Sequence, residues 1–222
     1  MVTEESFFEQ LEEKRKTDPL IGASLGAQDF YQRLYNSLIE SDNRIDMSLF
    51  LLWASGLAGM SCQMAVREHM KHEKTSPSMR LMPVDLANGT TFYVGEGINY
   101  YLFETEMPVV NFIMATYLKL SPEAELPSIT EAVQVSLKNI AAEDYKVWGM
   151  ENPQNLIPMY QQGWNSFEAA IRRYCANSDE WPILFALLLQ KVMEEAAKVM
   201  NAKTIVDAVV ENLLISAKLD FS

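Results

Sequence analysis

The pattern of hydrophobic and polar positions is dominated by one uncharged stretch in the first third of the chain. From Met47 to Val66 the sequence runs for 20 residues without a charged side chain. A helix of that length spans about 30 Å, enough to cross a bilayer or to form the fully buried centre of a soluble bundle. Because nothing else in the chain resembles a membrane protein, we expect a buried helix and no membrane insertion.

Apolar residues recur at helical spacing through most of the remaining chain. Prolines, glycines and polar turns separate these stretches, and Ser128-Ile129-Thr130-Glu131 has the form of a capping box. Residues 19–27 are rich in small side chains and are expected to form a connector. The pattern predicts helices over residues 3–16, 28–39, 44–73, 109–118, 128–148, 158–174, 182–200 and 204–217, with a short one over 98–104.

The pattern changes between residues 76 and 97. Pro77 and Pro83 are incompatible with a helix interior, and residues 90–94 are rich in β-branched and aromatic side chains. Asn88-Gly89 lies between two short extended stretches, and this dipeptide tolerates the positive φ that a tight hairpin turn requires. A β-hairpin is therefore predicted here.

The chain contains no internal repeat, low-complexity tract or long flexible linker. A length of 222 residues suits one sizeable domain with a substantial core. We therefore predict a single mainly α domain over residues 1–222, a multi-helix bundle of about eight helices with one β-hairpin near residues 80–95.

The net charge of the chain indicates which kinds of partner it can bind. The 30 acidic residues outnumber the 18 basic ones, and the formal net charge is −12. A sequence-independent grip on nucleic acid needs clustered Lys and Arg, so this balance argues against a nucleic-acid partner. An acidic surface favours solubility and basic partners.

Cysteine use and the N-terminal residues bear on the cellular compartment. Cys62 and Cys175 are the two cysteines of the chain, too few for a disulfide framework, which fits a reducing environment. The first residues show no basic region followed by an apolar one, the pattern of a secretory signal. The expected location is cytoplasmic.

The chemistry-bearing motifs are sparse. His69 and His72, three residues apart on the long helix and flanked by Glu68 and Glu73, are the candidate metal ligands. Metalloprotease helices instead space their histidines four residues apart, and basic side chains near a helix end also complement its negative pole. No glycine-rich phosphate loop is present. We therefore expect neither a metal nor another cofactor.

One segment stands out by its charge. Between Arg80 and Lys119 there is no Lys or Arg, while acidic and aromatic residues alternate. Such a surface suits a basic partner or a cationic ligand. The alternative is that the aromatic rings pack the hairpin onto the helices while the acids face water. The candidate binding residues are Asp85, Tyr93, Glu96, Tyr101, Glu104 and Glu106.

These observations favour a soluble, non-enzymatic protein that acts through protein–protein contact. The partner in such a contact could also be a second copy of the chain, in a homodimer. Two alternatives stay open. One is a helical-bundle enzyme or sensor that binds a small apolar ligand in its core. The other is an acidic inhibitor or immunity-type protein that neutralises a basic toxin or nuclease.

Overall fold

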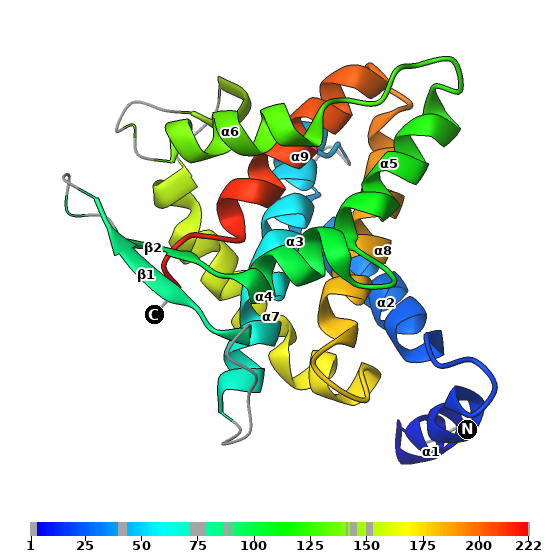
Figure 1. Ribbon diagram of the computed structural model, residues 1–222. Helices are drawn as coiled ribbons and strands as arrows, with labels where there is room; N and C mark the ends of the chain where they lie inside the picture. The colour runs from blue at the N-terminus through cyan, green and yellow to red at the C-terminus, as the bar shows by residue number, and fades with distance from the viewer. Residues whose placement is uncertain are drawn as a thin grey trace.

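The computed structural model describes residues 4–39, 44–71, 79–86, 89, 91–140, 142, 146–149 and 153–221. It is mainly helical with one two-stranded antiparallel hairpin, which confirms the predicted fold class (Figure 1). In chain order the elements are α1 (Glu4–Arg15), α2 (Ile21–Leu38), α3 (Met47–Met70), β1 (Met82–Asp85), β2 (Thr91–Val94), α4 (Glu96–Asn99), the π-helical turn η2 (Tyr100–Glu104), α5 (Val109–Leu120), α6 (Ile129–Asn139), the 3₁₀ turns η3 (Val147–Gly149) and η4 (Pro153–Leu156), α7 (Ile157–Tyr174), α8 (Glu180–Ala196) and α9 (Ala202–Ser216).

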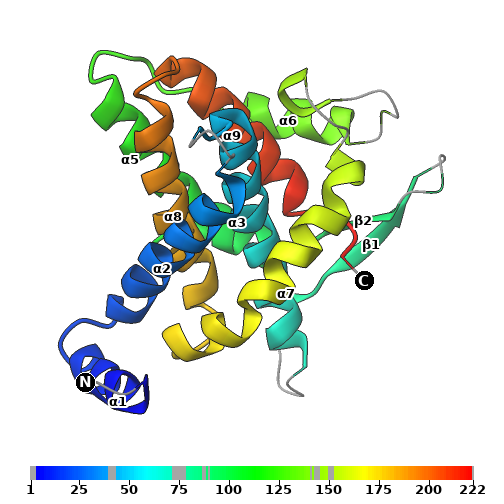
Figure 2. The ribbon, with the colours of Figure 1, turned by 180° about the vertical axis from the view of Figure 1, so that it is seen from behind.

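The uncharged stretch forms α3, the helix at the centre of the bundle (Figures 1 and 2). It packs most extensively against α8 and α9 and also contacts α2 and α7. By length and composition alone α3 could cross a membrane, but 83% of its most apolar window is buried inside the protein. The prediction of a buried helix is confirmed. At its start, the Asp46 carboxylate accepts hydrogen bonds from the N–H groups of Ser48 and Leu49.

Two glycines let neighbouring elements approach the central helix closely. A Cβ at Gly56 would overlap the ring of Tyr160 in α7, and a Cβ at Gly59 would overlap Ser216 and the Leu213 carbonyl in α9. Both glycines lie inside a helix, where glycine costs about 1 kcal/mol relative to alanine. Close packing of α7 and α9 on α3 offsets that cost.

The buried side chains of Ser55, Tyr160 and Asn212 form a hydrogen-bond network that joins these helices. The Asn212 amide of α9 donates to the Leu52 carbonyl (2.9 Å) and to Ser55 Oγ (2.8 Å). The Tyr160 hydroxyl donates to Asn212 Oδ1 at 3.0 Å, and Ser55 Oγ donates to the Leu51 carbonyl at 2.6 Å. Since an unpaired buried polar group costs roughly 1–3 kcal/mol, this network fixes the relative positions of α3, α7 and α9.

The predicted hairpin is present, with β1 and β2 paired from Met82↔Val94 to Asp85↔Thr91. Gly89 has φ +82°, a left-handed backbone conformation that glycine adopts readily and other residues rarely do. Asn88 lies outside the described residues. The C-terminal residues pack beside the other edge of β2, because the Tyr93 N–H donates to the Lys218 carbonyl at 2.7 Å. The hairpin is thereby joined to the end of α9.

Several predicted helix boundaries were wrong. The expected connector over 19–27 is mostly helix, because Gly22 and Gly26 pack α2 closely against Tyr174 and Leu184. The helix expected over 128–148 ends at Asn139, and near its expected end Trp148 adopts φ +55° in η3. The helix expected over 182–200 is α8, which begins at Glu180 and ends at Ala196. The last helix, expected to begin at residue 204, begins at Ala202, and the side chain of Asn201 caps it by accepting a 2.9 Å hydrogen bond from the Lys203 N–H.

Lys218 is a buried cation just beyond α9. It is 7% exposed, its Nζ donates to the Leu214 carbonyl at 3.1 Å, and within the described part of the chain it forms no ion pair. Burial lowers the pKa of Lys218 from 10.5 to about 8. The unfolded chain therefore binds more protons between these two values, so the lysine penalises folding below pH 8 and ceases to do so as the pH rises through 10.5.

We expect Lys218→Met to raise the free energy of unfolding at pH 7 by on the order of 1–3 kcal/mol, because it removes a buried charge while keeping the volume. The gain should shrink towards zero by pH 10.5, where lysine is neutral in both states. Urea denaturation of both proteins at the two pH values measures this. An unchanged or lower stability of the variant at pH 7 would contradict it.

Candidate functional site

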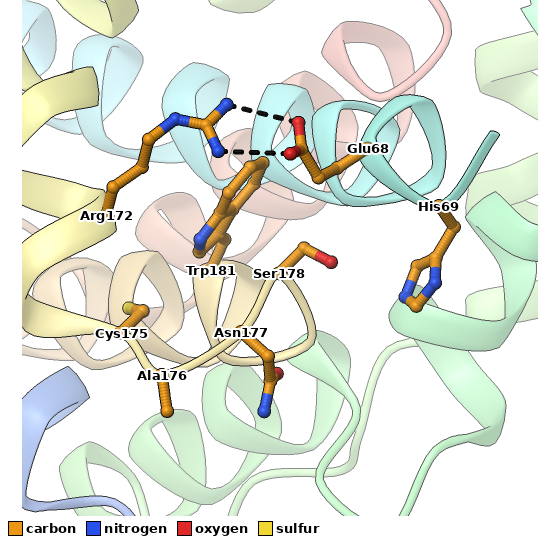
Figure 3. Close-up of a pocket in the computed structure, with 8 residues that line it drawn as sticks. All are labelled: Glu68, His69, Arg172, Cys175, Ala176, Asn177, Ser178 and Trp181. Carbon is orange, nitrogen blue, oxygen red and sulfur yellow. Dashed lines mark hydrogen bonds and ion pairs between the residues drawn. The ribbon is translucent and has the colours of Figure 1, made fainter. Parts of the chain in front are cut away.

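A polar pocket lies where α3 and α7 end and α8 begins (Figure 3). Its volume is about 380 Å³. α3 contributes the last charged turn of the central helix, and the other residues come from the α7–α8 junction. The lining residues are Glu68, His69, Arg172, Cys175, Ala176, Asn177, Ser178 and Trp181.

A bidentate ion pair joins two of the residues that line this pocket. The two Nη atoms of Arg172 each lie 3.1 Å from a different carboxylate oxygen of Glu68 (Figure 3). Arg172 also donates to Glu168 on its own helix, at 3.0 Å from Nη2, and its guanidinium lies 5.1 Å from the Trp181 ring centre. Two carboxylates and an aromatic face thus engage the one arginine of the pocket.

The electrostatics of the pair follow from these contacts. The hydrogen bonds from Arg172 and then from Lys71 lower the pKa of Glu68 from 4.5 to about 2, while Glu68 raises the pKa of Arg172. Both groups therefore stay charged at neutral pH. Because Arg172 is already neutralised by carboxylates, the pocket is a poor site for an anionic substrate.

The pocket thiol is not poised for nucleophilic attack. Cys175 is 5% exposed, and burial, reinforced by the nearby Glu180 carboxylate, raises the pKa of its thiol. Cys62 lies in the core of α3, where burial raises its pKa to about 12. A reactive cysteine needs a partly exposed, electropositive site that favours the thiolate. Both cysteines are protonated at neutral pH.

His69 belongs to a cluster that links three elements. Its Nε2 lies 2.7 Å from Oδ1 of Asp179, which precedes α8, and the Tyr101 hydroxyl of η2 donates to the same oxygen. Burial, with the hydrogen bond to Asp179, raises the pKa of Tyr101, so it remains a phenol. Among the described residues no group of three His, Cys, Asp or Glu side chains could hold a metal ion. His72, the other candidate ligand, lies outside the described residues.

A second concavity, the acidic hollow, is lined by Met79, Glu96, Tyr100 and Glu104 and has a volume of about 550 Å³. Glu96, Tyr100 and Glu104 follow one another at intervals of four residues along α4 and η2. Residues four apart lie on one side of a helix, and the π-helical turn that carries Tyr100 and Glu104 is closed by a 2.9 Å bond from the Thr105 N–H to the Tyr100 carbonyl. Tyr100 is 38% exposed.

The structure distributes the other predicted binding residues differently. Asp85 is exposed on β1 and accepts a 2.7 Å hydrogen bond from the Thr91 hydroxyl, and Glu106 is exposed beyond η2. Tyr93 is half-buried, with the Arg67 guanidinium 4.7 Å from its ring centre. Tyr101 is only 2% exposed, so it packs in the core and cannot serve as a surface contact.

Sequence reasoning chose Tyr101 and missed Tyr100 and Met79 as members of the hollow. The four-residue spacing from Glu96 through Tyr100 to Glu104 was the signal that could have selected Tyr100. Met79 comes from the segment before β1, and its position depends on tertiary packing against Gly97.

The chain matches no protein-family model, no curated protein and no solved structure. The assignment of a role therefore rests on the geometry of this molecule.

The Glu68 ion pair predicts an acid-dependent loss of stability. Since the pKa of Glu68 is lower in the folded protein, the carboxylate stabilises the fold above pH 4.5, and this contribution disappears as the pH falls towards 2. We expect Glu68→Gln to be less stable than the natural protein at pH 7 and the difference to close by pH 2. Thermal unfolding across this range measures it, with Glu125→Gln at an exposed position as the control. A difference that does not vary with pH would contradict the assignment.

Proposed function

We propose that this protein is soluble, cytoplasmic and non-enzymatic, and that it acts by binding a basic protein partner through the acidic hollow. The observation that carries the proposal is the convergence of Glu96, Tyr100 and Glu104 on one concave surface. This arrangement combines negative charge with an exposed aromatic ring, the two features that suit a surface rich in Lys or Arg.

Within the described residues, no ion pair compensates the charge of the hollow. Glu96, Glu104 and the nearby Glu106 are exposed and form no ion pair within the described part of the chain. The 38 residues between Arg80 and Lys119 contain no Lys or Arg. A patch of one sign attracts an oppositely charged partner and speeds its association at low salt. A surface salt-bridge network would have neutralised the patch.

The aromatic ring of the hollow is held in a defined position. Tyr100 packs edge-to-face on Tyr101, with ring centres 5.3 Å apart, and the Tyr101 hydroxyl is anchored on Asp179. A ring that is already ordered loses little conformational entropy on binding, which favours its use as an interface anchor. The hydrogen bonds of Tyr101 and His69 to Asp179 therefore help to hold the Tyr100 ring in place.

The chemistry of the polar pocket also supports a binding role over catalysis. Arg172 is saturated by carboxylates, and the Cys175 thiol is buried and protonated. An inhibitor of a basic toxin or nuclease is one form that such a binding protein could take, because it would use the same acidic surface.

The alternative function is the binding of a small apolar ligand. The candidate pocket for such a ligand lies between α2 and α7. A pocket of about 420 Å³ there includes Leu34, Trp53 and Phe167 among its lining residues. Of its polar lining residues, Arg33 is paired with Asp29, and the Ser166 hydroxyl donates to the Gln162 carbonyl of its own helix. Few polar groups are left to orient a ligand, so we rank this function second.

Reversal of charge at the acidic hollow tests the proposal. We expect Glu96→Lys/Glu104→Lys to retain the fold, because exposed charges contribute little stability. It should lose the partner that the natural protein captures from the native cell. The control, Glu123→Lys/Glu125→Lys, changes the net charge equally in the exposed α5–α6 connection. Quantitative affinity capture at two salt concentrations compares the three proteins.

Capture that is reduced in the hollow variant, unaffected in the control and weaker at high salt supports the proposal. Equal capture by all three proteins, or equal loss in both variants, would contradict it.

The two adjacent tyrosines should separate binding from stability. Tyr100→Ala should speed dissociation from the partner with little change in melting temperature, because its ring is exposed. Tyr101→Phe should instead lower the free energy of unfolding by about 1 kcal/mol, since it removes a hydrogen bond in the core. Surface plasmon resonance and thermal unfolding of each variant measure the two effects. If Tyr100→Ala lowered the melting temperature without speeding dissociation, Tyr100 would not be part of the interface.

A further inference from the structure

The residues that follow α9 run from the end of that helix to the hairpin. In Figure 1 this segment continues from α9 and passes beside β2. We call residues 217–221 the C-terminal strap. Four of its five residues are buried, namely Ala217, Lys218, Leu219 and Phe221. The strap therefore belongs to the folded core.

Hydrogen bonds attach the strap to two other elements. The Tyr93 N–H of β2 donates to the Lys218 carbonyl at 2.7 Å. The Gln63 amide of α3 donates to the carbonyls of Ala217 at 3.2 Å and Leu219 at 2.9 Å. Since α9 ends at Ser216, these three bonds can break together while the helices stay packed on one another.

The strap also carries the buried cation of the fold. An ammonium has three N–H groups, and among the described residues the Leu214 carbonyl is the one acceptor for Lys218 Nζ, at 3.1 Å. Burial of a charge that lacks a counter-ion costs free energy, because the group loses its hydration. Opening of the strap returns the ammonium to water and regains that free energy.

The surroundings of Lys218 do not neutralise its charge. The charged or titratable side chains on the elements that meet here are Cys62 and Arg67 of α3, Tyr93 of β2, Glu211 of α9 and Asp220 of the strap. Burial raises the pKa of Cys62 to about 12, so its thiol is neutral at pH 7. Within the described part of the chain, no carboxylate forms an ion pair with Lys218.

We propose that the C-terminal strap opens from β2 and α3 as a unit while the helical bundle stays folded, and that the buried ammonium of Lys218 promotes this opening. The open form uncovers the second edge of β2, because the Tyr93 N–H loses its acceptor. β2 leads through Gly95 into α4, the helix on which the acidic hollow begins. The strap is thus a conformational device next to the hollow, and its opening does not depend on what the hollow binds.

The direction of the pH dependence follows from the two states of Lys218. Its pKa is about 8 in the closed strap and returns towards 10.5 when the strap opens into water. The open form therefore binds more protons between these values, and opening becomes more frequent as the pH falls from 10.5 to 8. Below pH 8 the lysine is charged in both forms, and the opening equilibrium levels off. Between pH 9 and pH 7 we expect opening to increase about tenfold.

Native-state hydrogen exchange, followed by NMR and corrected for intrinsic exchange rates, tests the proposal. The Tyr93 amide reports opening of the strap, and the Ala58 amide, at the buried centre of α3, reports unfolding of the bundle. In the natural protein Tyr93 should exchange faster than Ala58, at a rate that low concentrations of urea do not change. Its protection should rise about tenfold from pH 7 to pH 9.

Two lysine variants separate charge from packing. Lys218→Met should slow Tyr93 exchange at pH 7 by about tenfold or more and abolish its dependence on pH, because the side chain stays neutral. Lys203→Met is the control, since Lys203 is an exposed lysine at the other end of α9, and it should match the natural protein.

Three results would overturn the proposal. In the first, Tyr93 and Ala58 exchange at the same rate and with the same urea dependence, so that the strap opens only when the bundle unfolds. In the second, Tyr93 exchange is equal in Lys218→Met and the natural protein. In the third, exchange in Lys218→Met is slower but keeps the pH dependence of the natural protein, which would assign the effect to packing.

Discussion

The burial of α3 is the constraint on which the rest of the structure depends. A helix with 20 consecutive uncharged residues is stable in water only when neighbours cover it on every side, and α8, α9, α2 and α7 do so. Close cover requires small residues where backbones meet, which Gly56 and Gly59 supply. Burial of polar groups costs free energy unless they are hydrogen-bonded, and Asn212 and Tyr160 supply such hydrogen bonds along the first half of the helix. Gln63 extends the same principle by donating to the carbonyls of Ala217 and Leu219, which ties the C-terminal residues to the core.

Charge returns to α3 only at its last turns, and the candidate sites gather there. Arg67 stacks on Tyr93 of the hairpin, Glu68 pairs with Arg172 of α7, and His69 contacts Asp179 before α8. The same end of the helix meets α4, because Gly97 lies against Val66. The last turns of α3 thus contact the hairpin, the α7–α8 junction and the helix that carries the acidic hollow, and these contacts position all three. A rigid support of this kind preorganises a binding surface.

Much of the fold could be predicted because its determinants are local. The uncharged run, the capping box at Ser128 and the Asn88-Gly89 turn each signal their element within a few residues. The errors arose where tertiary contacts decide, as at Gly22 and Gly26, whose small size permits helix packing and is not a sign of a connector. The candidate site was located only in part. Glu96 and Glu104 meet in one hollow, but the expected contact residue Tyr101 is buried, and its neighbour Tyr100 lines the hollow instead. The pairings of Glu68 with Arg172 and of His69 with Asp179 join residues more than 100 positions apart, and no spacing in the sequence predicts them.

The central functional claim is that a basic surface of a partner occupies the acidic hollow. Its most direct test is site-specific photo-crosslinking in the native cell, with a benzophenone amino acid in place of Tyr100 and, separately, in place of the exposed residue Glu123. Mass spectrometry then maps the crosslinked peptides. The account predicts that position 100 crosslinks one partner at a segment rich in Lys or Arg, and that position 123 does not. Crosslinks from position 100 to acidic or apolar segments, or the same crosslinks from both positions, would contradict it.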